Sequence, residues 1–287
     1  MNQAFTVFRR LAFLLALLSF PALLIAQTGT GSVQGLVKDP SGAVITGAKV
    51  SIVNTETQLT RATTTDGGGH YSFLALSPGQ YIVTAEALGF ANREEKIQVT
   101  VGSHLESDLS LGLGRPGTTV EVVGEMGATV NTLNQEVSSV VNSVEITQLP
   151  TLTRNPYDLV ATAANATQDS QAGVGDARGA GYALNGQRSA STSILLDGAE
   201  NVDLFTATVG QTVPLDAVQE FRVISNGMTA EYGRAAGGVV NVATKAGTNN
   251  LHGSAYEFNR VAALAANTYN NAAQGVEKAG FTRNQFG

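Results

Sequence analysis

Short runs of alternating hydrophobic and polar residues dominate the chain after its first thirty residues. In each run every second residue is apolar, and glycine, proline, asparagine and aspartate separate one run from the next. This alternation has the period of a β-strand with one buried face, and the separating residues are those that form tight turns. The pattern therefore predicts a chain that consists mostly of β-structure.

The first group of runs covers Thr30–Leu113 and predicts an all-β unit. Its turns have a chemical basis: in Asp39-Pro-Ser-Gly42, proline fixes φ and glycine accepts a positive φ. Seven short strands in this length favour a β-sandwich. The expected strands lie at residues 32–38, 48–52, 63–65, 71–73, 81–85, 96–101 and 105–111.

The composition changes at residues 112–117, GLGRPG, which are typical of a linker. The next residues, Thr118–Val123 (TTVEVV), have a high β-propensity and a single charge at Glu121. This segment is either an edge strand or an extended recognition segment.

From Val130 helical and strand periods alternate, which predicts an α+β domain. Asn155-Pro156 is a good helix start, because asparagine caps the helix and proline suits its first position. The spacing i, i+3, i+4 places Tyr157, Val160 and Ala161 on the buried face of that helix. Strands are expected at residues 137–141, 182–185, 193–197, 221–225 and 239–244, and helices at 146–149 and 214–220.

The most informative stretch is Ala230–Lys245, AEYGRAAGGVVNVATK, in which a turn of small residues leads into an alternating strand. A second alternating run, Leu251–Arg260, places Tyr256 and Phe258 on one face. Aromatic residues at a period of two are typical of strands in outer-membrane barrels, and part of another such strand begins at Arg283. A barrel needs at least about eight strands. We therefore expect the chain to be the front part of a longer protein.

Composition excludes several chemistries. The chain has no cysteine, so disulfides, cysteine-ligated zinc and a cysteine nucleophile are ruled out. The net charge of −6 argues against nucleic-acid binding, which usually requires a basic patch. We find no catalytic residues, no cofactor motif and no metal-ligand spacing among the histidines. Asp197–Asp203 fails the calcium-loop pattern, and a turn in which Asp197 accepts backbone amides explains it better.

The N-terminus predicts export. Two arginines, Arg9 and Arg10, precede the apolar run Leu11–Leu18, and the small residue Ala26 suits cleavage by signal peptidase. An uncleaved anchor helix is the alternative. The polar residues that begin at Gln27 favour a signal peptide at residues 1–26.

Two segments resemble known families. Residues 31–52 and 63–90, including the TDGGGHYSF run and the PGQY element, are similar to the carboxypeptidase regulatory-like domain, a prealbumin-like seven-strand sandwich. Residues 194–198 (ILLDG), 213–224 (VPLDAVQEFRVI) and 230–249 resemble the plug domain of TonB-dependent outer-membrane receptors. The combination resembles the Oar-like branch of that family.

The resemblance implies a transport function. In this family a plug occludes a 22-stranded barrel held in outer-membrane lipid, and the periplasmic protein TonB, energised through ExbB and ExbD, pulls on a short extended segment near the start of the plug. By position, Val120, Glu121, Val122 and Val123 are similar to that TonB-contact segment. They are equally well interpreted as the first strand of the plug. The substrate is unknown, and the loops at residues 168–181 and 201–212 are candidates for the substrate-facing apices. A role as spacers is an equally good interpretation of these loops.

The expected protein is thus multidomain, with a sandwich, an α+β plug and the start of an uncompleted transmembrane β-barrel. It is expected in the outer membrane, with the plug and sandwich facing the periplasm, and without enzymatic activity. The rival hypothesis is a secreted or periplasmic β-sandwich protein that binds or adheres without transport. The expected segments are a signal peptide at 1–26, the sandwich at 27–113, a linker with the candidate TonB-contact segment at 114–129, the plug at 130–248 and barrel strands at 249–287.

Overall fold

A computed structural model describes residues 29–114, 119–122, 135–149, 151, 154–168, 181–203 and 205–287. The predicted signal peptide at residues 1–26 and the candidate contact residue Val123 lie outside this part of the chain. Clustering of contacts divides the chain into two compact units, residues 1–247 and residues 248–287. Within the described residues, every helix is too short or too polar to cross a lipid bilayer.

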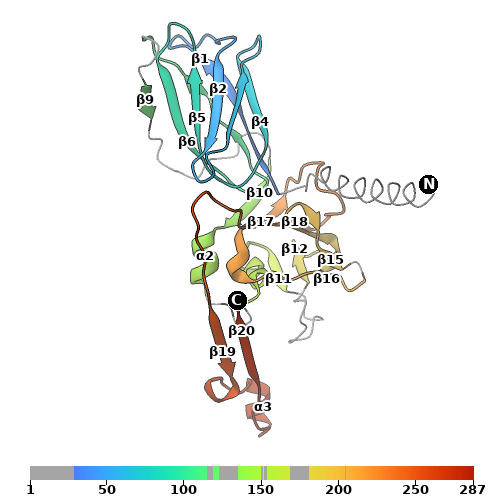
Figure 1. The fold of residues 1–287 in the computed structure, drawn as a ribbon. Coiled ribbons are helices and arrows are strands. Elements are labelled where there is room, and N and C mark those ends of the chain that lie inside the picture. The colour runs from blue at the N-terminus through green and yellow to red at the C-terminus, as the bar shows by residue number, and fades with distance from the viewer. Residues whose placement is uncertain are drawn as a thin grey trace, which may run out of the picture. The chain divides into compact units, whose positions relative to one another are not determined.

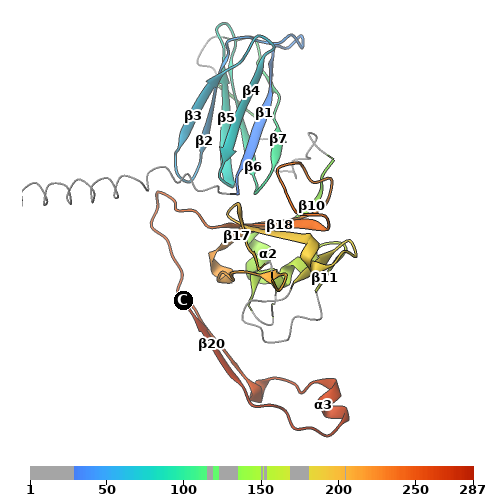
Figure 2. The same cartoon turned by 90° about the vertical axis from the view of Figure 1, so that its right-hand side faces the viewer.

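The N-terminal half of the first unit is a sandwich of two sheets (Figures 1 and 2). One sheet has the order β4-β1-β7, and β8 pairs with residues of β1 that come after those paired with β7. The other sheet has the order β3-β2-β5-β6-β9. The prediction of a β-sandwich is therefore confirmed. The strands are β1 Gly31–Lys38, β2 Lys49–Asn54, β3 Thr60–Thr64, β4 His70–Leu76, β5 Gly79–Glu86, β6 Asn92–Val99, β7 His104–Glu106, β8 Leu109–Ser110 and β9 Thr119–Val122.

The sandwich core follows from the alternation in the sequence. In β1 every second residue is buried, including Val33 and Val37, and the opposite positions are exposed or half-buried. The buried residues of the two sheets form one cluster that includes Val50, Phe73 and Val83, all 2% exposed or less. Removing such side chains from water is the main stabilising contribution of a fold of this kind.

The strand expected at residues 105–111 is divided into β7 and β8. Both pair with β1 in parallel, but the pairing is interrupted between Glu106 and Leu109. The interruption has a local cause: the carboxylate of Asp108 accepts the backbone N–H of Leu36 at 2.8 Å and takes the place of a backbone carbonyl. A side chain that competes for a ladder donor ends regular pairing at that point.

The C-terminal half of the first unit is built on a mixed five-stranded sheet with the order β10-β17-β18-β13-β14. β18 is its central strand, antiparallel to β17 and parallel to β13. Six of the seven residues of β18 are buried, as its central place requires. The strands are β10 Val137–Val141, β13 Thr192–Leu196, β14 Ala199–Glu200, β17 Val218–Asn226 and β18 Gly238–Thr244.

Two helices cover one face of this sheet. The short helix α2, Ser143–Gln148, is capped by Asn142, and the 3₁₀ helix η2, Pro156–Thr162, is capped by Asn155 as expected. Tyr157 and Val160 are buried, but Ala161 is exposed and the expectation for Ala161 was wrong. A 3₁₀ helix has three residues per turn, so the i+4 position points away from the face that i and i+3 share.

The helix expected at residues 214–220 is a second departure from the sequence prediction. Only the 3₁₀ turn η4, Leu215–Ala217, is helical, and β17 already begins at Val218. Val218 pairs with Thr244 and Glu220 pairs with Ala243, with an irregularity between them. Pairing with the central strand β18 thus overrides the local helix signal of Pro214.

Two small hairpins complete the first unit. β11, Ala166–Gln168, pairs with β12, Tyr182–Leu184, and β15, Val202–Asp203, pairs with β16, Thr208–Val209. The second hairpin occupies the predicted apex loop at residues 201–212. Of the other predicted apex, residues 169–180 lie outside the described part of the chain.

The second unit contains one hairpin. β19, Glu257–Val261, pairs antiparallel with β20, Thr282–Phe286, and the connection holds the 3₁₀ turn η5, Ala262–Leu264, and the short helix α3, Tyr269–Ala273. The prediction of a strand that begins at Leu251 was wrong, because regular pairing starts only at Glu257. Just before this register, Tyr256 and Gly287 exchange two backbone hydrogen bonds, at 2.9 and 3.1 Å.

Candidate functional site

The segment expected to contact a partner is an edge strand of the sandwich. The backbone of Thr119–Val122 forms β9, which pairs in parallel with β6 from Asn92↔Thr119 to Glu95↔Val122. The alternative that these residues form the first strand of the plug sheet is therefore wrong for the described segment, because the edge of that sheet is β10. An extended edge strand can accept a further strand from another protein.

The strand β10 lies at the edge of the five-stranded sheet and is the first strand that the structure describes after β9. It pairs with β17 through five residue pairs, from Val137↔Asn226 to Val141↔Phe221. Immediately before β10, the Glu136 carboxylate lies 2.7 Å from the Arg222 guanidinium of β17. These two side chains are only 1% and 7% exposed, respectively. A buried ion pair thus ties the start of the edge strand to its neighbour.

Arg222 belongs to the sheet face opposite the helices. Its Nε also donates to the Ser138 hydroxyl on β10 at 3.0 Å. Glu220, two residues earlier on β17, is 5% exposed and accepts the backbone N–H of Val101. Burial raises the pKa of Glu220, whereas the Val101 amide and the positive charge of Arg222 act in the opposite direction. This face of the sheet therefore carries two buried ionisable side chains, Arg222 and Glu220, and hydrogen bonds and opposite charges offset the cost of burying them.

The side chain of Asn201 links the β15–β16 hairpin to the buried Tyr157 of η2. The Asn201 amide donates to the Tyr157 hydroxyl at 2.9 Å and to the Gln211 carbonyl at 2.9 Å, and it accepts the Gln211 N–H at 2.8 Å. Burial raises the pKa of Tyr157 to about 12, so the hydroxyl that accepts the Asn201 amide N–H stays neutral. The predicted apex loop is thus attached rigidly at its base.

Asp197 directly follows β13, and its carboxylate accepts two hydrogen bonds from Thr244 of β18. Its Oδ1 accepts the Thr244 N–H and its Oδ2 accepts the Thr244 hydroxyl, both at 2.8 Å. Asp197 thus accepts one backbone N–H, as predicted in part, but this N–H belongs to Thr244 at the end of β18 and not to the turn after β13. Among the described residues, no group of three or more acidic or histidine side chains is arranged to hold a metal ion. The Asp197 carboxylate therefore links the end of β13 to the end of its parallel neighbour β18.

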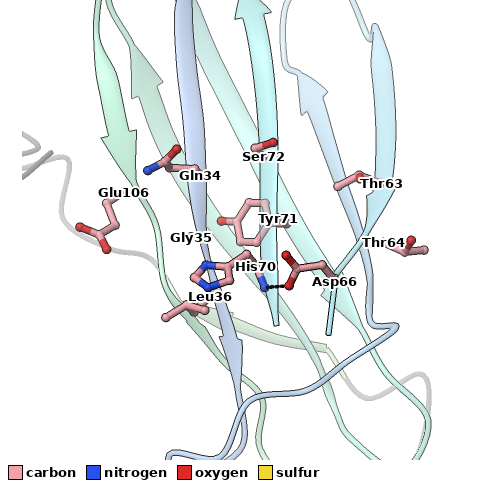
Figure 3. Close-up of a pocket in the computed structure, with 10 residues that line it drawn as sticks. All are labelled: Gln34, Gly35, Leu36, Thr63, Thr64, Asp66, His70, Tyr71, Ser72 and Glu106. Atoms are coloured by element: carbon pink, nitrogen blue, oxygen red, sulfur yellow. Dashed lines mark hydrogen bonds between the residues drawn. The ribbon is translucent and has the colours of Figure 1, made fainter. Parts of the chain in front are cut away.

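A polar groove of about 420 Å³ lies on the sandwich. Figure 3 shows its lining, which comes from β1, β3, β4, β7 and the turn between β3 and β4. The Asp66 carboxylate in the groove accepts the N–H groups of His70 and Gly68 at 2.9 and 2.8 Å, and these bonds lower its pKa. The Asp66 carboxylate therefore stabilises the turn between β3 and β4. The lining residues are Gln34, Gly35, Leu36, Thr63, Thr64, Asp66, His70, Tyr71, Ser72 and Glu106.

The three histidines are separate in the structure as in the sequence. His104 bonds to the Ser32 hydroxyl at 2.8 Å and lies 3.2 Å from the Glu231 carboxylate, whereas His70 and His252 are exposed.

The buried Glu136–Arg222 pair was not found by sequence reasoning. Alternating charged and apolar residues in β17 look like an ordinary strand with one solvated face, and Glu136 lies outside the expected strand.

Three families match the sequence. Residues 32–112 match the carboxypeptidase regulatory-like domain, residues 131–240 match the TonB-dependent receptor plug domain, and residues 243–287 match an outer membrane beta barrel domain. The first match covers the sandwich, the second covers β10 to the start of β18, and the third covers the β19–β20 hairpin. The matches follow the same order as the resemblances in the sequence.

Among curated proteins, the chain is similar to the TonB-dependent transporter Oar of Myxococcus xanthus, with 26% identity over 200 residues. That alignment covers 67% of this chain and 18% of the relative, so the chain spans less than a fifth of the length of that protein.

Solved structures give weaker matches. Catechol 1,2-dioxygenase from Acinetobacter sp. ADP1 is 14% identical, with 32% of this chain and 59% of that chain covered and a TM-score of 0.25. The Bacillus anthracis TIE protein is 22% identical, with 29% and 16% covered and a TM-score of 0.27. Likenesses at this level carry no functional argument.

Proposed function

We propose that this chain, which holds the N-terminal domains of a TonB-dependent outer-membrane transporter, gates the energised uptake of a substrate across the outer membrane. The observation that carries the proposal is the order of the parts. An extended strand, β9, precedes a plug domain with its own core, and a segment of the barrel family follows. In this arrangement the plug is the gate, and the strand ahead of it is the point where force is applied.

The partner is TonB, and the contact residues are Val120, Glu121, Val122 and Val123. An extended segment binds a partner sheet through its main-chain N–H and C=O groups, which explains why the side chains in this segment need not be distinctive. ExbB and ExbD would supply TonB with energy from the inner membrane, and the barrel would be held in outer-membrane lipid. The proposed location is the outer membrane, with the sandwich and the plug facing the periplasm.

The plug sheet offers a route for the force. A pull on the residues near β9 reaches β10 next, which is an edge strand with a single neighbour. An edge strand pulled from one end separates from its neighbour pair by pair, whereas central strands such as β18 are held on both sides. β10 is therefore the first plug strand to leave its place. Its departure would open a path without unfolding the central strands.

Binding of the purified periplasmic domain of TonB to the full-length transporter tests the proposal. Val122→Pro removes a backbone N–H and should weaken binding at least tenfold, because a strand cannot add where its ladder donor is missing. Val122→Ala keeps the backbone and is the matched control, with binding within about twofold of the wild type. Equal binding by all three proteins would contradict the assignment of this segment.

A further inference from the structure

The sandwich has a feature that transport by a plug and barrel does not require: the edge of β6 holds the proposed contact segment. Four consecutive residue pairs join Asn92–Glu95 of β6 to Thr119–Val122 of β9. β9 is the terminal strand of the sheet formed by the described residues, so one edge faces β6 and its other edge ends the sheet (Figure 1). We propose that the sandwich is a strand-presenting domain, which fixes the contact segment in extended form and offers its outer edge to TonB.

The chain that leads to β9 is attached next to the start of β6. The Ala91 N–H donates to the Gly112 carbonyl at 2.9 Å, and Phe90 and Leu113 form an isolated antiparallel bridge. A Cβ added at Gly114 would lie 2.8 Å from the Ala91 Cβ, so the backbone approaches β6 closely at this point. These contacts lie outside β9 and independently direct the chain towards the β6 edge.

The residues of β6 that pair with β9 are Asn92–Glu95, and all four are half-buried. Without β9, the backbone groups on this side of β6 would form an open sheet edge. The β6 edge is therefore a docking surface whose occupant is the chain's own contact segment.

Fixing the segment in advance favours capture by TonB. A free linker must lose backbone freedom in each residue when it joins a partner sheet, and a segment already held as a strand has lost most of that freedom. β6 uses one edge of β9, and strand addition uses the other, so both contacts can exist together. The inference rests on the proposed function, because it takes Val120–Val122 as the TonB contact.

An engineered disulfide between β6 and β9 tests whether β6 presents the contact segment to TonB or conceals it from TonB. The chain has no cysteine, so Glu94→Cys with Glu121→Cys introduces the only two thiols. These positions are register partners, and neighbouring strands lie about 4.8 Å apart, within the Cα range of a disulfide. Gln98→Cys with Glu121→Cys is the matched control, because Gln98 lies four residues further along β6, about 13 Å away. Only the first pair should crosslink on oxidation of the full-length protein.

TonB binding by the oxidised protein then decides the question. We expect the double variant Glu94→Cys with Glu121→Cys, once oxidised, to bind the periplasmic domain of TonB as tightly as its reduced form, or up to about tenfold more tightly. Gly114→Val, which crowds Ala91, should weaken binding about tenfold, whereas Gly112→Val should not, because no atom lies within 4 Å of a Cβ at Gly112.

Several results would overturn the inference. A missing crosslink shows that β9 does not occupy the β6 edge, and a tenfold or greater loss of TonB binding on oxidation shows that β6 conceals the segment. If either result is found while Val122→Pro still weakens TonB binding at least tenfold, the proposed function stands and only strand presentation fails. If Val122→Pro binds TonB normally, the contact segment itself is wrong, whatever the crosslink shows.

Discussion

Glu136 and Arg222 form a buried ion pair across 2.7 Å at the point where the edge strand of the plug sheet begins. Glu136 immediately precedes β10, and Arg222 lies on β17, the only neighbour of β10 in the described sheet. The pair therefore links the strand that would receive the pull to the part of the plug that would stay in place. On the proposed function we call this pair a latch, because we predict that its strength sets how easily β10 separates from β17.

Breaking this latch should loosen the edge strand. We expect Glu136→Ala to destabilise the plug by about 3 kcal/mol, because it leaves the Arg222 charge buried without its partner. The double variant Glu136→Leu with Arg222→Met should cost less, since neither charge remains. Hydrogen exchange of the β10 amides is the direct measurement. Faster exchange confined to β10 in the single variant supports the latch, and unchanged exchange there would argue against it.

Close backbone packing at Gly35 gives a prediction for the sandwich. A Cβ at this position would lie 1.9 Å from the Ser107 carbonyl oxygen, a backbone atom that cannot move aside cheaply. Gly35→Ala should therefore lower the free energy of unfolding by more than about 2 kcal/mol. Gly67→Ala is the matched control, because a Cβ there meets no atom within 4 Å, and its effect should stay within about 0.5 kcal/mol. Urea denaturation of both variants provides the comparison, and equal midpoints would contradict the predicted packing.

The buried carboxyl of Glu220 predicts a pH dependence. Its pKa in the folded chain is raised by burial above the ordinary value of 4.5. The folded state therefore binds this proton more tightly than the unfolded state does, so the stability from Glu220 is complete below about pH 4.5 and is lost as pH rises through the folded pKa. Glu220→Gln should remove that part of the pH dependence.

The test is a comparison of the two proteins across pH. The free energy of unfolding of the wild type, measured relative to that of Glu220→Gln, should fall as the pH rises from about 4 to about 8. All other titrating groups are shared, so the difference isolates Glu220. A difference that stays constant with pH, or that grows in favour of the wild type, would show that the carboxyl is not destabilised by burial.

Local patterns were sufficient to predict most of the sandwich. The alternation of Val33 and Val37 predicted the buried face of β1, and the cap at Asn155 predicted where η2 begins. The errors arose where pairing between distant strands decides the structure. β17 begins at Val218 because β18 is beside it, and the pairing of β9 with β6 depends on a chain path that the sequence does not reveal.

The candidate site was predictable only in part. The sequence left Thr118–Val123 as either an edge strand or a recognition segment, and it did not indicate that Thr119–Val122 would join the edge of the sandwich sheet. The Glu136–Arg222 pair could not be predicted, because it requires knowing that β10 lies beside β17. Both the sheet that β9 joins and the Glu136–Arg222 pair depend on pairing between strands that are far apart in the sequence. The periodicity of a single segment does not reveal such pairing.

Crosslinking in cells tests the central claim most directly. A single cysteine is placed at Val120 or Val122 of the full-length transporter, and another at Lys245 as the control, in cells whose TonB carries one cysteine in its periplasmic domain. The chain has no cysteine of its own, so each product identifies one position. We predict a TonB adduct in the outer-membrane fraction from positions 120 and 122 and none from position 245. No adduct from either segment position, or equal adducts from all three, would contradict the proposal that this chain is a TonB-operated gate.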